Sequence, residues 1–346
     1  MNKNLFANWE APASWHKMTT LECHTGGEPL RIITSGFPLL KGETILEMRR
    51  DCQQNHDHLR TALMFEPRGH ADMYGCVITP PERPDSDFGV LFLHNEGYST
   101  MCGHAIIALT RVAVEAGVVR ALEPVTSLRI DAPCGQIKAY AEIKKGQIRR
   151  IYFDNVPSFV FDADAEVAVP GLGTVSYTLA YGGAFYAYVD ASSLGLSLRA
   201  ENHSQIIDAG RRIKQALHSS RAITHPLHAD LGFLYGTIFS APSETAGVHS
   251  RNVCIFADGE LDRSPTGSGV AGQAAILHAK GVLPLGEKIV IESILGSQFQ
   301  VSALNTLAYG PHNAIIPRVE GSAHIVGKAS FYIDPSDPLQ NGFIFR

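Results

Sequence analysis

The sequence predicts an α/β fold made of two similar domains, each with β-strands wrapped around a central helix. Two observations carry this prediction. A strand, a polar loop and a helix of small apolar residues follow one another over residues 89–119, and the same order recurs over 252–283. The length of 346 residues and the hydrophobic fraction of 45% also correspond to about two globular domains.

The internal repeat appears when Cys102 is aligned with Thr266. This alignment also pairs Gly103 with Gly267, His104 with Ser268 and Gly117 with Gly281. The segments that follow Cys102 and Thr266 are rich in small and branched apolar residues on nearly every face, which predicts two helices that are buried all round. Each ends at a glycine placed for a left-handed C-cap.

The other expected elements of the first half surround this helix. A glycine pair precedes a strand in HTGGEPLRIIT, residues 24–34. A second strand is expected at GVLFLHN, residues 89–95, directly before the loop that carries Cys102. After the helix, the alternating apolar pattern of CGQIKAYAEI at 134–143 predicts a half-buried strand.

The second half repeats this order. A glycine pair precedes a strand in YGGAFYAYVDA, residues 181–191, and the strand NVCIFAD at 252–258 leads into the loop before Thr266. The segment LGSQFQVSAL at 295–304 alternates in the same way as its counterpart in the first half. The sequence therefore predicts that the two halves are two copies of one α/β unit.

Composition excludes several classes of partner. The formal net charge is −5 with no basic cluster, so nucleic acid is not an expected partner. No apolar run is long enough to cross a bilayer, and the N-terminal MNKNLFANWE lacks the apolar core of a secretory signal. Six scattered cysteines without CxxC pairs favour free thiols in a reducing compartment, so we expect a cytoplasmic protein without a membrane partner.

Fifteen histidines raise the question of a metal site. His56 and His58 lie two residues apart, and His225 and His228 share the segment THPLH. Neither pair has a carboxylate or cysteine at zinc-ligand spacing on a recognisable scaffold. The GxGxxG fingerprint of a nicotinamide-binding unit is also missing from the sequence. We therefore expect neither a metal nor a nicotinamide cofactor.

Cys102 lies where the first buried helix is expected to begin. A helix N-terminus offers unpaired N–H groups and a partial positive charge, which bind anions and lower the pKa of a thiol. Thr266 takes the equivalent place on the second helix. Two such helix starts, facing each other across a domain cleft, would hold a small carboxylate and allow proton transfer at the carbon that bears it. The alternative is that Cys102 is simply a small core residue.

Five motifs together resemble the signatures of the proline racemase family, in the family's order and along nearly the whole chain. They are HTGGEP (24–29), DMYG (72–75), MCGHAIIA (101–108), GGAFYAYVDA (182–191) and DRSPTGSG (262–269). The resemblance implies a diaminopimelate-epimerase-like fold, in which two similar α/β domains hold the active site between them. A homodimer is expected at the level of the family.

The resemblance also completes the expected domain organisation. The boundary between the halves is expected within residues 155–171, and the family pattern implies that the end of the chain returns to the first domain. We expect a first domain of residues 1–160 plus 322–346, which carries Cys102. Residues 161–321 then form a second domain, which carries Thr266.

Thr266 is where this sequence departs from the family's racemases and epimerases, which carry a cysteine at both helix starts. A threonine hydroxyl has no accessible pKa and is a poor base for a second face of the substrate. The Cys102–Thr266 pair is therefore similar to that of the trans-3-hydroxy-L-proline dehydratase branch of the family. That branch implies a small imino acid as the substrate.

The resemblance implies a role for each remaining site residue. His104 and Asp262 would hold the ring nitrogen of the substrate. Gly103, Gly267 and Ser268 would offer backbone or hydroxyl donors to its carboxylate. Read without the family, Asp262 has a second interpretation as a cap at the start of the helix.

The expected reaction is an elimination of water that requires no metal, pyridoxal phosphate or nicotinamide. The 3-hydroxyl group and the α-hydrogen of the substrate lie on the same face of the ring. Cys102 would remove the α-proton and then assist the departure of hydroxide, while the N–H groups at the helix starts stabilise the carbanion-like transition state. The first product, Δ2-pyrroline-2-carboxylate, would tautomerise to Δ1-pyrroline-2-carboxylate.

Other functions stay open at this point. They are a 4-hydroxyproline 2-epimerase or proline racemase, an isomerase of another cyclic amino acid or carboxylate, and a non-catalytic protein that binds an imino acid. Thr266 argues against the first, and Cys102 argues against the last because binding alone does not need a thiolate. His24 and Glu28 either line the cleft or shape the turn in which they lie, so we leave both outside the expected site.

Overall fold

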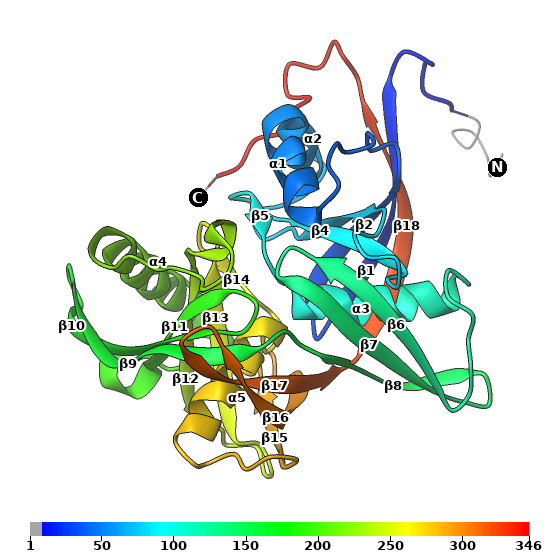
Figure 1. Cartoon of the computed structure of the whole chain (residues 1–346). Helices are drawn as coiled ribbons and strands as arrows, with labels where there is room; N and C mark the ends of the chain where they lie inside the picture. Colours follow the sequence, from blue (N-terminus) through cyan, green and yellow to red (C-terminus); the bar gives the residue numbers. More distant parts are fainter. Residues whose placement is uncertain (1–8, 346) are drawn as a thin grey trace, which may run out of the picture.

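Two helices of small apolar residues, α3 (Gly103–Glu115) and α5 (Gly267–Ala279), lie at the centres of two groups of strands (Figure 1). The structure is a computed structural model, and it describes residues 9–345. Within those residues, none of the helices combines the length and the apolar character that crossing a membrane requires.

The first half of the chain encloses α3. Its strands are β1 (His16–Thr25), β2 (Glu28–Ser35), β3 (Gly75–Thr79), β4 (Phe88–Leu93), β5 (Tyr98–Ser99), β6 (Val125–Ala132), β7 (Gly135–Lys144) and β8 (Gln147–Asp154), joined by β18 (Ala323–Ile333) from the end of the chain. The pairing runs β18–β1–β2–β3–β4–β6–β7–β8, and only β2–β3 and β4–β6 are parallel.

The second half encloses α5. Its strands are β9 (Ser158–Val169), β10 (Gly173–Tyr181), β11 (Phe185–Asp190), β12 (Leu234–Pro242), β13 (Ser250–Phe256), β14 (Glu260–Leu261), β15 (Lys288–Glu292), β16 (Gln298–Tyr309) and β17 (His312–Gly321). The pairing runs β9–β10–β11–β12–β13–β15–β16–β17, and again only the third and fifth pairs, β11–β12 and β13–β15, are parallel. The repeat predicted from the sequence is therefore a repeat of the whole strand order.

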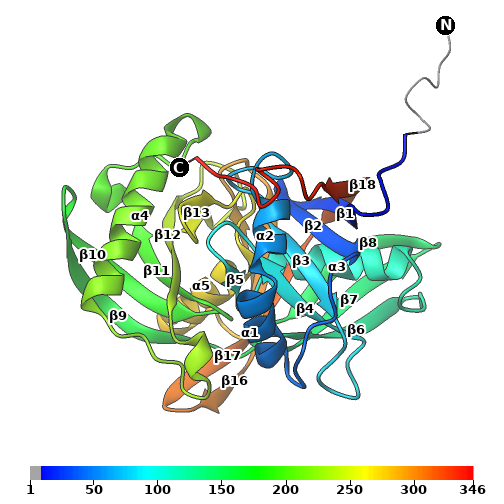
Figure 2. The same cartoon turned by 90° about the horizontal axis from the view of Figure 1, so that it is seen from above.

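Outer helices complete each half at the same point of the repeat. Between β2 and β3 the chain forms α1 (Ile45–Asn55) and α2 (Asp57–Met64), and between β11 and β12 it forms α4 (His203–Ser220). Seen from above, α4 lies over the strands of the second half, and α1 and α2 lie at the middle of the view, between the strands of the two halves (Figure 2). The short 3₁₀ helices are η1 (Ala191–Leu194), η2 (Ala200–Asn202) and η3 (Ala229–Leu231).

The predicted elements coincide with the observed ones. The strands expected at 89–95, 134–143, 252–258 and 295–304 overlap β4, β7, β13 and β16. Both central helices are buried along nearly their whole length, and the glycines expected to end them have φ of 71° at Gly117 and 72° at Gly281. A left-handed residue at that position satisfies the last carbonyls of a helix at no steric cost, because glycine has no Cβ.

The two halves are joined by β17, which pairs with β8 of the first half as well as with β9 and β16 of the second. At this junction the Arg318 guanidinium lies 2.6 Å from the Asp154 carboxylate. The boundary expected between residues 160 and 161 falls inside β9. The division into two domains stays a prediction, which the repeated strand order supports.

Candidate active site

The N-termini of α3 and α5 meet at the centre of the molecule. A Cβ added to Gly103 would lie 2.5 Å from the Cα of Gly267, which is closer than any side chain permits. Only a glycine at both positions lets the two backbones approach in this way. The helix starts therefore face each other, as the paired motifs predict.

A cavity of about 10 Å³ lies at this meeting point. Its lining includes all seven residues predicted from the sequence, namely Cys102, Gly103, His104, Asp262, Thr266, Gly267 and Ser268. The other lining residues are Tyr74, Met101, Tyr186, Tyr235 and Phe256. Such a volume holds about one water molecule, so a ring-sized ligand needs more room than this conformation of the site offers.

Cys102 caps the N-terminus of α3 with an extended backbone, and its Sγ lies 3.2 Å from Nδ1 of His104. Burial raises the pKa of this thiol well above its usual value, and the Asp262 and Glu28 carboxylates act in the same direction. The Ala105 N–H and the Tyr74 hydroxyl lower the pKa without offsetting burial. The lowered thiol pKa expected at a helix start is therefore wrong for this closed site, because loss of water outweighs the helix.

His104 is buried beside this thiol, and burial lowers the pKa of its imidazole. The Asp262 carboxylate and a hydrogen bond with the Pro29 backbone act in the opposite direction. The ring also meets the edge of Tyr74 at a centroid distance of 4.8 Å. In the closed site, Cys102 and His104 thus form a neutral thiol–imidazole pair.

Thr266 precedes α5 with φ of 66°, an unusual backbone angle for a β-branched residue. Its hydroxyl donates a hydrogen bond of 2.7 Å to the Asp262 carboxylate, whose other oxygen accepts the Ser264 N–H at 2.7 Å. Asp262 therefore fastens the loop before α5 and positions Thr266. The interpretation of Asp262 as a cap of the helix is wrong, because within the described residues its carboxylate bonds only residues that precede α5 and the helix start has no side-chain cap. The same carboxylate lines the cavity.

Both helix starts present backbone donors to the cavity. The first helical hydrogen bond runs from the Ile106 N–H to the Cys102 carbonyl in α3, and from the Val270 N–H to the Thr266 carbonyl in α5. The N–H groups of Gly103 and the residues directly after Thr266 precede this ladder. They can therefore bind a carboxylate at the meeting point of two helix dipoles.

Three tyrosines and a phenylalanine of the cavity were missed at the level of the sequence. Tyr74 and Tyr186 lie inside the quoted motifs DMYG and GGAFYAYVDA, but their role was not foreseen. A further signal connects Tyr74 with Tyr235, because DMYGCVI at 72–78 aligns with FLYGTIF at 233–239. Each Tyr–Gly pair stands at the start of an equivalent strand, β3 or β12.

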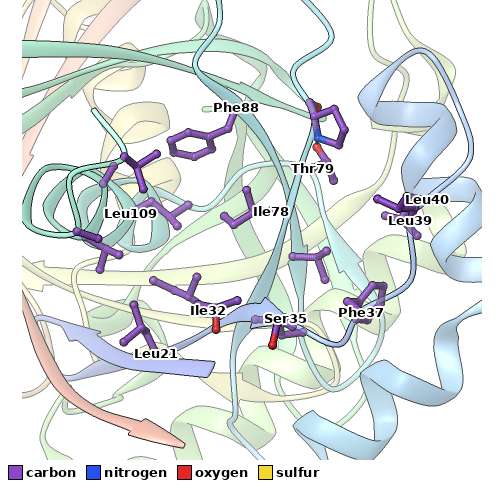
Figure 3. Close-up of a pocket in the computed structure, with 18 of the residues that line it drawn as sticks. Leu21, Ile32, Ser35, Phe37, Leu39, Leu40, Ile78, Thr79, Phe88 and Leu109 are labelled. Atoms are coloured by element: carbon purple, nitrogen blue, oxygen red, sulfur yellow. The ribbon is translucent and has the colours of Figure 1, made fainter. Parts of the chain in front are cut away.

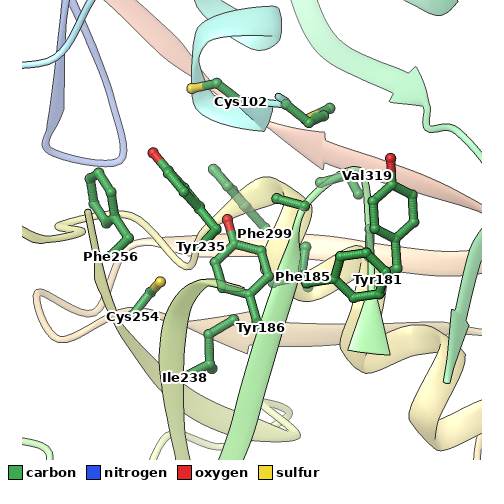
Figure 4. Packing of buried hydrophobic residues seen from close by; sticks show 14 of the residues in the cluster. Cys102, Tyr181, Phe185, Tyr186, Tyr235, Ile238, Cys254, Phe256, Phe299 and Val319 are labelled. Atoms are coloured by element: carbon green, nitrogen blue, oxygen red, sulfur yellow. The ribbon is translucent and has the colours of Figure 1, made fainter. Parts of the chain in front are cut away.

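The hydroxyls of Tyr186 and Tyr235 point toward the end of α3 that bears Cys102 (Figure 4). The Tyr186 hydroxyl lies 2.8 Å from the hydroxyl of Ser268. The Tyr235 ring packs against Phe256 with a centroid distance of 5.4 Å. The second half thus places aromatic rings beside the Cys102 thiol.

Three residues left open by the sequence lie outside the lining. Glu28 is fully buried and accepts the Arg263 N–H at 2.7 Å, so it connects the two halves behind the cavity. His24 stacks on His324 at a centroid distance of 5.2 Å. His225 packs against Tyr181 at 4.8 Å.

A much larger cavity of about 490 Å³ lies in the first half between β2, β3 and the C-terminal part of α3 (Figure 3). Its lining is mostly aliphatic, with Ile32, Ile78 and Leu109 among its residues. It contains none of the titratable residues predicted for the site. Chemistry rather than volume therefore identifies the cavity at the two helix starts as the candidate active site.

Comparison with known proteins agrees with this geometry. The family described as "Proline racemase" matches residues 20–344. A trans-3-hydroxy-L-proline dehydratase of Colwellia psychrerythraea is 56% identical, with all of both chains covered. A 3-hydroxyproline 2-epimerase of Burkholderia multivorans is 46% identical over 95% of this chain and 98% of its own.

Among solved structures, a hydroxyproline epimerase from Agrobacterium vitis with bound trans-4-OH-L-proline has a TM-score of 0.90 and 28% sequence identity. The match covers 95% of this chain and 96% of the epimerase. It confirms the mixed α/β fold that the sequence predicts.

Proposed function

The chain belongs to the proline racemase family, and on that premise we propose that it is a trans-3-hydroxy-L-proline dehydratase. The reaction is the cofactor-independent loss of water from this imino acid, which makes the enzyme a hydro-lyase. The observation that carries the proposal is the pair of side chains at the facing helix starts, one thiol and one threonine hydroxyl. The full-length similarity to the Colwellia enzyme supports the same assignment.

Cys102 is the base in this mechanism. In the closed site without substrate it is a thiol, because burial raises its pKa. The substrate brings a positively charged ring nitrogen, which we place near Asp262 and His104. A positive charge within a few ångströms favours the thiolate over the thiol. Binding of the substrate thus favours the thiolate form of Cys102. This thiolate then removes the α-proton of the substrate.

The helix starts stabilise the transition state. As the α-proton leaves, negative charge spreads onto the substrate carboxylate, which we place between the N–H groups of Gly103 and Gly267 and the hydroxyl of Ser268. These donors are fixed in place before the reaction, so their stabilisation costs no reorganisation. Removal of one such donor typically costs about 3–4 kcal/mol of transition-state stabilisation.

A 3-hydroxyproline 2-epimerase is the second candidate, because a relative with that name is 46% identical. Epimerisation needs a base on each face of the α-carbon. In this protein the residue opposite Cys102 is Thr266, whose hydroxyl proton is already donated to Asp262. Because of that hydrogen bond, we infer that Thr266 orients the substrate and does not exchange protons with it.

The test is to incubate the purified protein with trans-3-hydroxy-L-proline, trans-4-hydroxy-L-proline and L-proline, and to follow both pyrroline formation and inversion at the α-carbon. We expect pyrroline only from the first substrate and no inversion of any of them. Inversion without pyrroline formation would replace the dehydratase by an epimerase. Tight binding without either reaction would indicate an imino-acid-binding protein.

The cellular compartment and the oligomeric state of the protein are also part of the proposal. All six cysteines are free and buried, which supports a reducing compartment such as the cytoplasm. The family resemblance supports a homodimer. Size-exclusion chromatography with light scattering measures the oligomeric state directly.

A further inference from the structure

Tyr235 carries a hydroxyl group that the rest of the site leaves unused. The side chain is 5% exposed, and within residues 9–345 its buried oxygen has no partner at hydrogen-bond geometry. Burying a hydroxyl without a partner is destabilising, so such a group is expected to have a partner when the site is occupied. The ring lines the active-site cavity, so a bound substrate can meet this hydroxyl.

The position of this hydroxyl places it on the Cys102 side of the cavity. Tyr235 starts from β12 in the second half, yet its hydroxyl lies beside the hydroxyls of Tyr74 and Ser99 from the first half. The Tyr74 hydroxyl in turn acts directly on the Cys102 thiol. Figure 4 shows the Tyr235 hydroxyl pointing toward the helix end that bears Cys102.

We propose that Tyr235 is the acid that protonates the departing 3-hydroxyl group of the substrate. This inference rests on the proposed dehydratase function. It assigns the residue that assists the departure of the hydroxyl group. The α-hydrogen and the 3-hydroxyl of trans-3-hydroxy-L-proline lie on one face of the ring. The base and the acid must therefore approach from one side, as Cys102 and Tyr235 do.

The step balances without any added reactant. The Cys102 thiolate takes the α-proton, and the electron pair of that C–H bond becomes the C2–C3 double bond. The C3–O bond breaks, and its electron pair leaves on oxygen, which takes the proton of Tyr235 and departs as water. The Tyr235 phenolate then regains a proton from the Cys102 thiol through the Tyr74 hydroxyl, which restores both groups.

The hydroxyls of Thr266 and Tyr186 are less suited to this role. Thr266 donates its proton to Asp262 at 2.7 Å, and the Tyr186 hydroxyl is paired with Ser268 at 2.8 Å. Burial also raises the pKa of Tyr235 well above its usual value, so the residue keeps its proton until a strong base such as departing hydroxide appears.

The test compares two leaving groups in Tyr235→Phe. Hydroxide needs a proton to depart, whereas fluoride leaves without one. We expect Tyr235→Phe to lose roughly 10²–10⁴-fold in kcat for pyrroline formation from trans-3-hydroxy-L-proline, the usual contribution of a general acid. The same variant should release fluoride from trans-3-fluoro-L-proline within a few-fold of the wild-type rate.

Tyr181→Phe is the matched control, since Tyr181 is also a fully buried tyrosine whose hydroxyl lacks a partner in the described part of the chain, but it lies outside the cavity. Tyr181→Phe should release water from the hydroxylated substrate and fluoride from the fluorinated one at the wild-type rates.

Two results would overturn the inference. One is water loss by Tyr235→Phe near the wild-type rate. The other is an equal fall for both leaving groups, which would mean that the ring hydroxyl only shapes the site. A wild-type protein that forms no pyrroline at all would instead refute the proposed function, so the two failures are distinguishable.

Discussion

At the scale of single residues, Cys102 carries the proposed chemistry. Replacing it by serine keeps the size of the side chain but supplies a hydroxyl that is far harder to ionise. We expect Cys102→Ser to lose at least about 10²–10⁴-fold in kcat, with an unchanged circular dichroism spectrum. Turnover near the wild-type rate in the folded variant would remove Cys102 from the mechanism.

We propose that Thr266 decides between elimination and epimerisation. Because it stands at the helix start that faces Cys102, Thr266→Cys installs a second thiol on the opposite side of the substrate. Cysteine is not β-branched, so the change adds no strain at the φ of 66°. We expect a gain of α-inversion on proline or 4-hydroxyproline, seen as solvent deuterium in an inverted product.

Thr266→Ala is the control for this change and should gain no inversion. The wild type is expected to exchange the α-hydrogen from one face only, since Cys102 alone removes and returns a proton there. A folded Thr266→Cys protein without inversion would show that Thr266 does not face the α-carbon, or that the cleft rather than the second base decides the reaction. A ligand-bound structure separates these two.

His225 gives the protein a titration that lies outside the active site. Burial lowers the pKa of its imidazole to about 4, and the neighbouring His228 and His312 act in the same direction. Its Nδ1 accepts the N–H groups of Leu227 and His228, which protonation would break. The contribution of His225 to stability is therefore complete above pH 6.5 and is lost as the pH falls from 6.5 toward 4.

His225→Asn tests this titration, because the amide oxygen replaces the Nδ1 acceptor without titrating. Urea unfolding at pH 7.5 and pH 5.5 measures the free energy of unfolding in both proteins. The wild type should lose about 1 kcal/mol more than the variant between these two values. Equal losses would mean that His225 does not couple folding to pH.

How far the sequence predicts single residues depends on the kind of property. The identity of the cavity residues followed from motifs and from the repeat, and all seven lie together. Their roles stay proposals. The pKa of Cys102 was predicted in the wrong direction, because helix position is visible in a sequence but the closing of two halves over a thiol is not.

At the scale of elements, the close contact of α3 and α5 depends on the missing side chains of Gly103 and Gly267. In Gly103→Ala the new Cβ would meet the Gly267 backbone at 2.5 Å, so the helix starts must move apart. A displacement of this kind typically costs about 10²-fold in rate. We expect a loss of at least that size in kcat/KM, measured by pyrroline formation.

Gly97→Ala is the matched control, because an added Cβ there meets nothing within 4 Å. It should retain wild-type activity. Activity in Gly103→Ala equal to that of the control would mean that catalysis does not require the observed approach of the two helices.

Element positions were predictable because the period of apolar residues, the glycine pairs and the terminal glycines act locally. The Tyr–Gly pairs at the starts of β3 and β12 were not recognised, although they repeat in the sequence. From the sequence alone, a tyrosine at the start of an apolar strand is interpreted as a core residue. Only the pairing of the two halves shows that both hydroxyls reach one cavity.

At the scale of the whole molecule, the cavity of about 10 Å³ is too small for a substrate ring, so we expect the two halves to move apart when the substrate binds. Cys102 is 4% exposed, so iodoacetamide reaches it only in the open form. Inactivation by iodoacetamide should therefore be slow, and pyrrole-2-carboxylate should protect, because it is planar at the α-carbon and mimics the transition state. Equal inactivation with and without this ligand would place the reactive thiol elsewhere.

The pairing of β1 with β18 joins His16 to Ile333, so two neighbours in the sheet are made far apart in time during synthesis. While a ribosome is still translating, β1 lacks this partner, whereas every strand around α5 has already been made by residue 321. We therefore expect the second half to be completed before the first, which reverses the usual order in which N-terminal parts fold first. Cys102 therefore lies in an incomplete half until β18 has been made, and we expect a chain that stops before β18 to be inactive.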